Sequence, residues 1–98
     1  MSEAIILEFK GVAPDKYQAV NKILGINSDT GQGDWPAGLQ SHVAAAADGA
    51  LVVFEVWDSR ESQGAFMASR LGPALDKVGL PDPARVEWMP LLGEYRSN

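Results

Sequence analysis

The chain contains a single histidine, His42, and the sequence predicts Glu55 as its partner. Two short runs rich in Val, Ala, Phe and Trp flank Asp48 and Gly49, which readily adopt the positive φ angles of a two-residue type I′ turn. This pattern predicts a β-hairpin over residues 40–57, and counting outward from the turn sets His42 opposite Glu55. A carboxylate that fixes the imidazole tautomer suits a general base acting on a phenol or an activated C–H. A structural cross-strand polar pair would show the same pattern, and the sequence leaves both interpretations open.

The same register divides the side chains of the hairpin between two faces. It sets Val43 opposite Phe54 and Gln40 opposite Trp57. One face is uniformly apolar, whereas the other mixes polar and apolar side chains and is where we expect a pocket. The apolar face carries Val43, Ala45, Val52, Phe54 and Val56, and the mixed face carries His42, Ala44, Val53, Glu55 and Trp57.

Three tryptophans and one arginine are further candidates for contacting a ligand. Trp35, Trp57 and Trp88 could form an aromatic cage around a planar molecule, although large aromatic residues such as Trp57 and Trp88 more often pack in a core or a dimer. Arg70, which falls off the apolar face of a predicted helix, could hold an anionic group or could remain in solvent near a turn.

Few residues are available to bind a metal ion or a nucleotide cofactor. There is no cysteine, and the one histidine is not spaced with carboxylates so that three ligands would converge. The glycine-rich stretch GQGDWPAG does not lie between a strand and a helix, as a dinucleotide-binding loop would. We therefore predict no metal and no cofactor.

Composition indicates a globular protein with no nucleic-acid or membrane partner. The 98 residues are 46% hydrophobic and 21% charged, and no run approaches the roughly 20 apolar residues that cross a bilayer. The net charge is −5 and the eight basic residues are scattered, which argues against binding to phosphates. No secretory signal is visible at the N-terminus, so we expect a cytoplasmic location and one domain over residues 1–98.

Period-two alternation predicts a strand over residues 4–10, followed by a short amphipathic helix that begins at Pro14 and ends at Gly25. Residues 26–38 have the composition of a long loop. The helix should present one apolar stripe, consisting of Tyr17, Val20, Ile23 and Leu24.

After the hairpin, Asp58 is predicted to cap a second helix that ends at Gly79 and is kinked or interrupted at Gly72 and Pro73. A last strand begins near residue 85, and Pro90 restricts it to a sheet edge or a strand end. The order βαββαβ predicts an α+β, ferredoxin-like fold in which both helices cover one face of a four-stranded antiparallel sheet. We expect the uncovered face to expose Val53, Trp57 and either Trp88 or Met89, and to pair with a second copy of the chain.

This order of elements, together with HVAAAADG and VWDSRESQGAFMASRLGPAL, resembles the dimeric α/β-barrel superfamily and, within it, antibiotic-biosynthesis-monooxygenase-like proteins. The resemblance implies a barrel formed by two ferredoxin-like subunits, each with an interior pocket between sheet and helices that Trp57 would line. Some members oxygenate aromatic polyketides without metal or flavin, and others degrade haem. Many of the monooxygenase-like members carry a histidine in the second helix, roughly where Phe66 stands here.

These observations predict a homodimer that binds a small hydrophobic or aromatic molecule. It would act by cofactor-independent oxygenation, which the resemblance implies, or by proton abstraction, with His42 as base and Glu55 as orienting group. The predicted substrate-binding residues are Trp57, Phe66, Arg70 and Trp88. The alternatives are a non-catalytic dimeric module, in which the pocket is filled by side chains, and haem breakdown, which needs a histidine facing open space.

Overall fold

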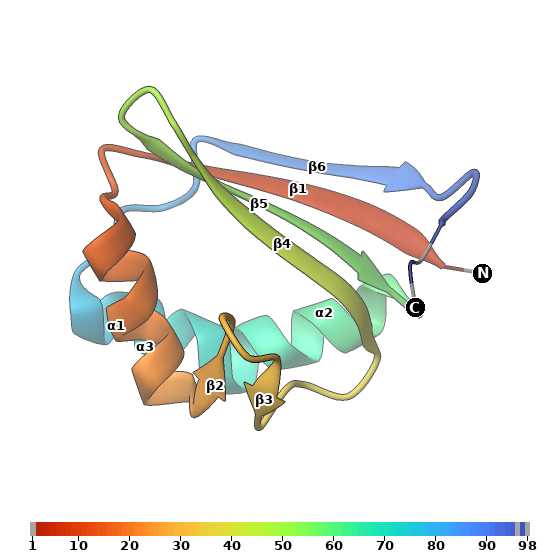
Figure 1. Ribbon diagram of the computed structural model, residues 1–98, viewed down its shortest axis with the longest axis horizontal. Coiled ribbons are helices and arrows are strands. Elements are labelled where there is room, and N and C mark those ends of the chain that lie inside the picture. Colours follow the sequence, from red (N-terminus) through yellow and green to blue (C-terminus); the bar gives the residue numbers. More distant parts are fainter. Residues whose placement is uncertain (1, 96, 98) are drawn as a thin grey trace.

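A single layer of helices covers one side of a four-stranded antiparallel sheet in the computed structural model, which describes residues 2–95 and 97 (Figure 1). The strands are β1 (Glu3–Lys10), β4 (Leu39–Ala47), β5 (Ala50–Trp57) and β6 (Arg85–Pro90), in the spatial order β4-β5-β1-β6. The helices are α1 (Pro14–Leu24), α2 (Arg60–Phe66) and α3 (Gly72–Val78). The predicted α+β, ferredoxin-like fold is therefore confirmed.

The hairpin of β4 and β5 has the predicted turn and, over most of its length, the predicted register. Asp48 and Gly49 both adopt positive φ angles, 23° and 74°. His42 pairs with Glu55, and Val43 pairs with Phe54. The predicted pairing of Gln40 with Trp57 is wrong, because a bulge between Leu39 and Ser41 inserts an extra residue and makes Leu39 the partner of Trp57.

Helix α1 has the predicted bounds but a narrower apolar stripe. Pro14 stands in its first turn, and Gly25 follows it in the left-handed conformation with φ 76°. Val20 and Leu24 are buried, whereas Ile23, predicted in the same stripe, is 45% exposed. The buried face of the helix includes the side chain of Asn21 and not that of Ile23.

The second helical segment begins one residue later than predicted and is interrupted where expected. Ser59, and not Asp58, is the N-cap of α2, because the Ser59 hydroxyl accepts a hydrogen bond from the Ser62 amide. A turn of π-helix, Met67–Leu71, separates α2 from α3 ahead of Pro73, which has no amide hydrogen to donate. The segment ends at Gly79, as predicted, with φ 85°.

Residues 26–38, predicted as a loop, contain a small two-stranded sheet of β2 (Ile26–Asn27) and β3 (Gln32–Gly33). The Asn27 side chain accepts hydrogen bonds from the amides of Asp29 and Thr30, and these bonds close the turn between β2 and β3. Gly33 has φ 120°, and a Cβ at this position would overlap the carbonyl oxygen of Gly25. The turn chemistry that indicated a loop therefore also builds this compact hairpin.

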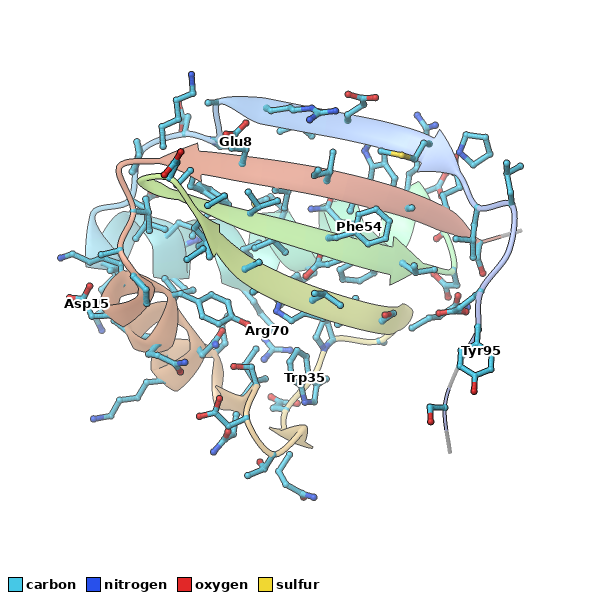
Figure 2. All side chains as sticks on the ribbon, turned by 45° about the horizontal axis from the view of Figure 1, so that its top comes forward. Glu8, Asp15, Trp35, Phe54, Arg70 and Tyr95 are labelled. Carbon is cyan, nitrogen blue, oxygen red and sulfur yellow. The ribbon has the colours of Figure 1, made fainter. Side chains whose placement is uncertain are left out.

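The structure reverses part of the prediction about which hairpin face is covered. Val53 and Trp57, predicted on the uncovered face, are 7% and 0% exposed because they pack against the helices. The uncovered face instead carries Val43, 57% exposed, and Phe54, 37% exposed. Figure 2 shows Phe54 on the side of the sheet away from the helices.

The register of β6 decides between the two alternatives for the last strand. Trp88 pairs with Ile5, a fully buried core residue, and therefore lies on the covered side. Met89 pairs with Ala4 and lies on the uncovered side. An apolar uncovered face is present as predicted, although Met89, and not Val53 or Trp57, contributes to it.

No helix within residues 2–95 is long and apolar enough to span a membrane.

Candidate functional site

Four side chains form a continuous chain of hydrogen bonds on the covered face of the sheet. His42 on β4 and Glu55 on β5 are cross-strand partners, and Nδ1 of His42 lies 2.7 Å from Oε2 of Glu55. The other carboxylate oxygen, Oε1, accepts a 3.0 Å hydrogen bond from the indole of Trp57. On the far side of the imidazole, Nε2 lies 2.6 Å from the hydroxyl of Tyr17 on α1. The sheet and α1 are thereby joined through polar groups.

The chain runs from the core toward solvent. Trp57 is fully buried and Glu55 is 5% exposed, whereas the His42 side chain retains 12% of its exposure. Burying a carboxylate is tolerable here because both of its oxygens accept hydrogen bonds. Among the described residues, no buried side-chain nitrogen or oxygen lacks a hydrogen-bond partner.

Donor and acceptor chemistry fixes the direction of these hydrogen bonds. As a carboxylate, Glu55 only accepts, and the indole of Trp57 only donates. His42 therefore donates from Nδ1 to Glu55, and in the neutral imidazole Nε2 is then an acceptor. The Tyr17 hydroxyl must donate to Nε2. The pair of His42 and Glu55 thus has the geometry that a general base requires, with the carboxylate selecting the tautomer.

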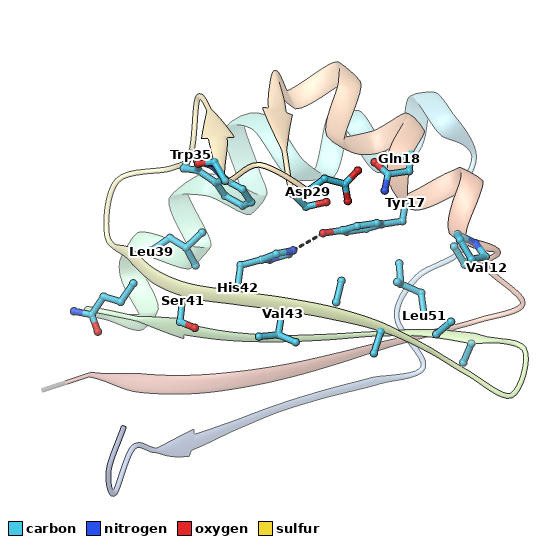
Figure 3. A pocket seen from close by; sticks show the side chains of 18 residues that line it. Val12, Tyr17, Gln18, Asp29, Trp35, Leu39, Ser41, His42, Val43 and Leu51 are labelled. Carbon is cyan, nitrogen blue, oxygen red and sulfur yellow. Dashed lines mark hydrogen bonds between the residues drawn. The ribbon is translucent and has the colours of Figure 1, made fainter. Parts of the chain in front are cut away.

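The solvent end of this chain opens into a groove of about 630 Å³. Strand β4 forms one side of the groove, and α1 and the segment between β2 and β4 form the other (Figure 3). The rings of Tyr17, His42 and Trp35 all line it, together with the polar side chains of Gln18 and Asp29. Such a mixture of aromatic surface and a few polar groups is typical of small-molecule sites.

Trp35 stands beside His42 at the wall of the groove. The two ring centroids are 5.4 Å apart and the ring planes are inclined by 52°. The indole N–H of Trp35 donates to the carbonyl of Gly31, which anchors the ring to the small hairpin of β2 and β3. The predicted long loop therefore supplies a positioned aromatic wall.

A second, much smaller cavity of about 50 Å³ lies beneath the groove, between the sheet and the helices. Glu55, Phe66 and core aliphatic residues line it, and five residues line both spaces: Tyr17, Trp35, Leu39, His42 and Leu51. These five side chains therefore form the partition between groove and core. An engineered cavity that holds benzene measures roughly 150 Å³, so the inner cavity is too small for an aromatic ligand. The interior pocket that the family resemblance implies is accordingly almost filled by side chains.

The remaining predicted site residues are not gathered around the groove. Phe66 packs on Trp57, with ring centroids 5.8 Å apart, and faces the inner cavity. Arg70 lies over Phe66 and donates from Nη2 to the carbonyl oxygens of Leu24 and Asp34. Substrate contact by Trp57, Phe66 and Arg70 stays a prediction.

The three tryptophans do not form the wall of one cage. Trp35 lines the groove, Trp57 is buried beneath it, and Trp88 lies under the guanidinium of Arg60, 5.3 Å from the ring centroid. Substrate contact by Trp88 also stays a prediction.

Sequence reasoning missed Tyr17 as part of the site. It counted this residue only as apolar, although tyrosine commonly has an apolar ring in the core and its hydroxyl directed elsewhere. The available signal was its place in the first half of a helix packed on the strand that carries His42. A single sequence does not specify which helix residue meets which strand residue.

The geometry does not fit an axial ligand to haem iron. Such a ligand requires a free imidazole nitrogen, and both ring nitrogens of His42, the one histidine in the chain, are engaged by Glu55 and Tyr17. The site therefore does not fit haem.

Comparison with known proteins identifies the fold but not the chemistry. No protein-family model and no curated protein matches the chain. A putative antibiotic biosynthesis monooxygenase from Chloroflexus aurantiacus is 20% identical, with a TM-score of 0.67 and 98% of each chain covered. Rv0793 from Mycobacterium tuberculosis is 24% identical, with a TM-score of 0.64 and 98% of this chain and 100% of that chain covered. The chain shares their fold.

A third structure with this fold was solved with a ligand. It is a monooxygenase from the gene ActVA-Orf6 of Streptomyces coelicolor, in complex with Nanaomycin D. It is 17% identical, with a TM-score of 0.59 and 99% of this chain and 92% of that chain covered. The predicted resemblance to monooxygenase-like proteins is thus confirmed for the fold, and identities this low carry no residue roles across.

Proposed function

We propose that this protein binds a small planar aromatic molecule in the groove beside β4 and removes a proton from it. His42 is the base, and Glu55 fixes its tautomer. The observation that carries the proposal is the hydrogen-bonded pair at the wall of a groove of about 630 Å³, in which Nε2 of His42 meets the Tyr17 hydroxyl and Glu55 holds the opposite ring nitrogen. Pockets of roughly 300–1,000 Å³ accommodate ligands of drug size.

The groove is suited to a ring system rather than to a strongly charged ligand. Trp35, Tyr17 and His42 provide three aromatic rings, and Leu39 provides apolar contact. No arginine or lysine is among the described residues that line the groove, and Arg70 donates to two backbone carbonyls outside it. Fused-ring phenols match this surface better than phosphorylated or polycarboxylate compounds do.

The fold supports oxygenation as the step that follows proton removal. Two of the structural relatives are called monooxygenases, one of them only putatively. For a ring CH₂ conjugated to a ring carbonyl, as in anthrone, loss of a proton leaves a carbanion that is delocalised onto the carbonyl oxygen and reacts with dioxygen. One oxygen atom becomes the new ketone and the other leaves as water, so the reaction consumes one O₂ and needs no reductant.

The proposal is tested by measuring binding and oxygen consumption separately. Wild-type protein is titrated with 1-naphthol, 7-hydroxycoumarin and anthrone by calorimetry, and the same solutions are followed with an oxygen electrode. His42→Asn should retain binding within a few-fold and lose turnover by about 100-fold or more, the usual contribution of a general base. Turnover that is unchanged in His42→Asn would refute the role of His42.

We further propose that the protein is a cytoplasmic homodimer in which the uncovered sheet faces meet. Val43 and Phe54 give that face an exposed apolar surface, and an isolated monomer would leave this surface in water. Sedimentation velocity over a range of concentrations tests this proposal independently of the chemistry.

A non-catalytic dimeric module is the second candidate function. It is favoured by the complete pairing of the polar chain, in which Tyr17, His42, Glu55 and Trp57 satisfy one another without a ligand. Such a chain could simply join α1 to the sheet. Binding of the three probes without consumption of oxygen or release of a proton would support the module.

A further inference from the structure

We infer that the hydroxyl of Tyr17, rather than the imidazole itself, receives the proton of the ligand, and that His42 accepts the hydroxyl's own proton. This inference rests on the proposed function and assigns the atom that meets the ligand. It starts from one contact: the hydroxyl occupies Nε2 of His42 at 2.6 Å, so a ligand cannot reach that nitrogen unless Tyr17 moves away.

The ring geometry favours a proton transfer between these two groups. The planes of Tyr17 and His42 are within 5° of parallel and their centroids are 6.0 Å apart. Figure 3 shows the two rings end to end, with the hydroxyl at the edge of the imidazole. The accepting lone pair of Nε2 lies in the ring plane at this edge, and the hydroxyl oxygen stands 2.6 Å away, within hydrogen-bond distance for donation along that lone pair.

The hydrogen-bond directions give the relay one polarity. With Glu55 ionised and the imidazole neutral, Tyr17 donates to His42, His42 donates to Glu55, and Trp57 donates to the same carboxylate. Within this chain, the acceptor for a proton leaving Tyr17 is therefore His42. Glu55 is buried and accepts two hydrogen bonds. Its negative charge stabilises the imidazolium that forms beside it.

The transfer balances without any other reactant. The ligand O–H bond breaks and a new O–H bond forms on Tyr17, while the original Tyr17 O–H bond breaks and an N–H bond forms at Nε2. The products are a ligand anion, a neutral tyrosine and a cationic His42 in contact with anionic Glu55. No atom changes oxidation state. Because the first acceptor is a phenol oxygen, the substrate class is compounds about as acidic as phenols, such as fused-ring phenols.

The position of Tyr17 fits a relay better than a purely structural role. Its side chain lines both the groove and the inner cavity, so its hydroxyl stands at the boundary between solvent and core. Among the described residues that line both spaces, Tyr17 is the one whose side chain carries a hydroxyl group. Behind it, His42 accepts the proton, and Glu55 and Trp57 act as positioning residues.

The test uses 7-hydroxycoumarin, whose absorption spectrum differs between the neutral and ionised forms. Calorimetry measures its binding, and absorption measures the ionised fraction of the bound probe. Wild-type protein should increase that fraction over free probe in the same buffer. Tyr17→Phe should bind within about three-fold but lower the ratio of ionised to neutral bound probe by about tenfold, the effect of losing one hydrogen bond to a charged group. The matched control is Tyr95→Phe, which removes the hydroxyl of an 89% exposed tyrosine and should change neither quantity.

Two results would separate the relay from the proposed function. If Tyr17→Phe ionises the bound probe as well as wild type does, His42 acts directly, so the relay is wrong and the proposed function stands. If wild type binds neither 7-hydroxycoumarin nor 1-naphthol, or binds them without ionising them, the proposed function is wrong and the relay falls with it.

A measurement without ligand tests the relay even if Tyr17→Phe does not fold. Long-range ¹H–¹⁵N spectra of wild-type protein should show the neutral His42 ring protonated at Nδ1, with Nε2 as acceptor. A ring protonated at Nε2 would donate to Tyr17 and reverse the direction of transfer, which overturns the relay.

Discussion

The two faces of the sheet contrast in a way that ordinary patterning does not predict. The covered face holds a carboxylate, an imidazole and an indole N–H inside an apolar core, and all are hydrogen-bonded. The uncovered face carries exposed Val43 and Phe54, and its Arg85–Glu87 ion pair lies in solvent on the edge strand β6, with about half of each side chain exposed. A one-sided antiparallel sheet normally shows the reverse, with apolar residues inside and polar residues in water.

This contrast separates the two tasks that we propose for the hairpin. Residues that alternate along β5 either join the polar chain, as Glu55 and Trp57 do, or form the apolar outer surface, as Phe54 does. The proposed chemistry on one face and the proposed association on the other should therefore respond differently to substitutions at neighbouring positions.

Trp57→Ala should cause the largest loss of stability. Trp57 is fully buried and also donates to Glu55, so truncation creates a cavity and leaves a carboxylate oxygen unpaired, at a cost of about 3–5 kcal/mol. Phe54→Ala, on the outer face, should cost less than about 1 kcal/mol in dilute protein, where association does not contribute. Urea unfolding at low protein concentration measures both. Equal losses would show that the outer face is as well packed as the inner one.

Phe54→Glu should act on association rather than on folding. A charge in the centre of the proposed dimer contact must be desolvated without a partner, which should raise the dimer dissociation constant by about 100-fold or more. Sedimentation velocity should then show monomers whose far-ultraviolet circular dichroism matches that of wild type. Monomeric wild-type protein would contradict the dimer, and an undiminished Phe54→Glu dimer would place the contact elsewhere.

Glu55→Gln should weaken the chain of hydrogen bonds without removing all of its bonds. The amide can accept from Trp57, but its NH₂ group meets Nδ1 of His42, which favours the tautomer protonated at Nε2. We expect a loss of about 1–3 kcal/mol in unfolding free energy and a change of tautomer visible in ¹⁵N spectra. The matched control, Glu61→Gln on the exposed first turn of α2, should cost no more than about 0.5 kcal/mol. An unchanged tautomer in Glu55→Gln would argue against control by the carboxylate.

The sequence was sufficient for the hairpin because its turn is chemically specific. Asp48 and Gly49 select one turn type, and a two-residue loop then determines every pair that follows, including His42 with Glu55. The bulge at Gln40 has no comparable signal, so the pairing failed beyond it. Similarly, Asp58 and Ser59 are both good N-cap residues, and only the hydrogen bond to Ser62 distinguishes them.

The sequence could not show which face the helices cover. Period-two alternation separates two faces only when one is polar, and here Phe54 and Val53 are both apolar neighbours on β5. The choice depends on packing against residues far along the chain, such as Leu24 and Phe66. The same limit hid Tyr17, whose contact with His42 spans 25 positions and depends on how α1 docks on β4.

Arg70→Lys should have the smallest effect and should refine the comparison within the covered side. One guanidinium nitrogen of Arg70 donates to the carbonyls of Leu24 and Asp34, and so ties the π-helical turn to the segment that carries Trp35. A lysine ammonium stands one bond closer to the backbone than Nη2 does and should lose one of these bonds, at a cost of about 1 kcal/mol. Arg60→Lys is the matched control, because the Arg60 side chain is 53% exposed where it pairs with Glu3, and it should cost less than about 0.5 kcal/mol.

If Arg70 positions the groove wall, Arg70→Lys should also weaken binding of 1-naphthol by a few-fold while Arg60→Lys leaves it unchanged. Equal affinities in the two variants would show that Arg70 stabilises the helix junction alone and that the anchoring of Trp35 to Gly31 is sufficient to hold the wall.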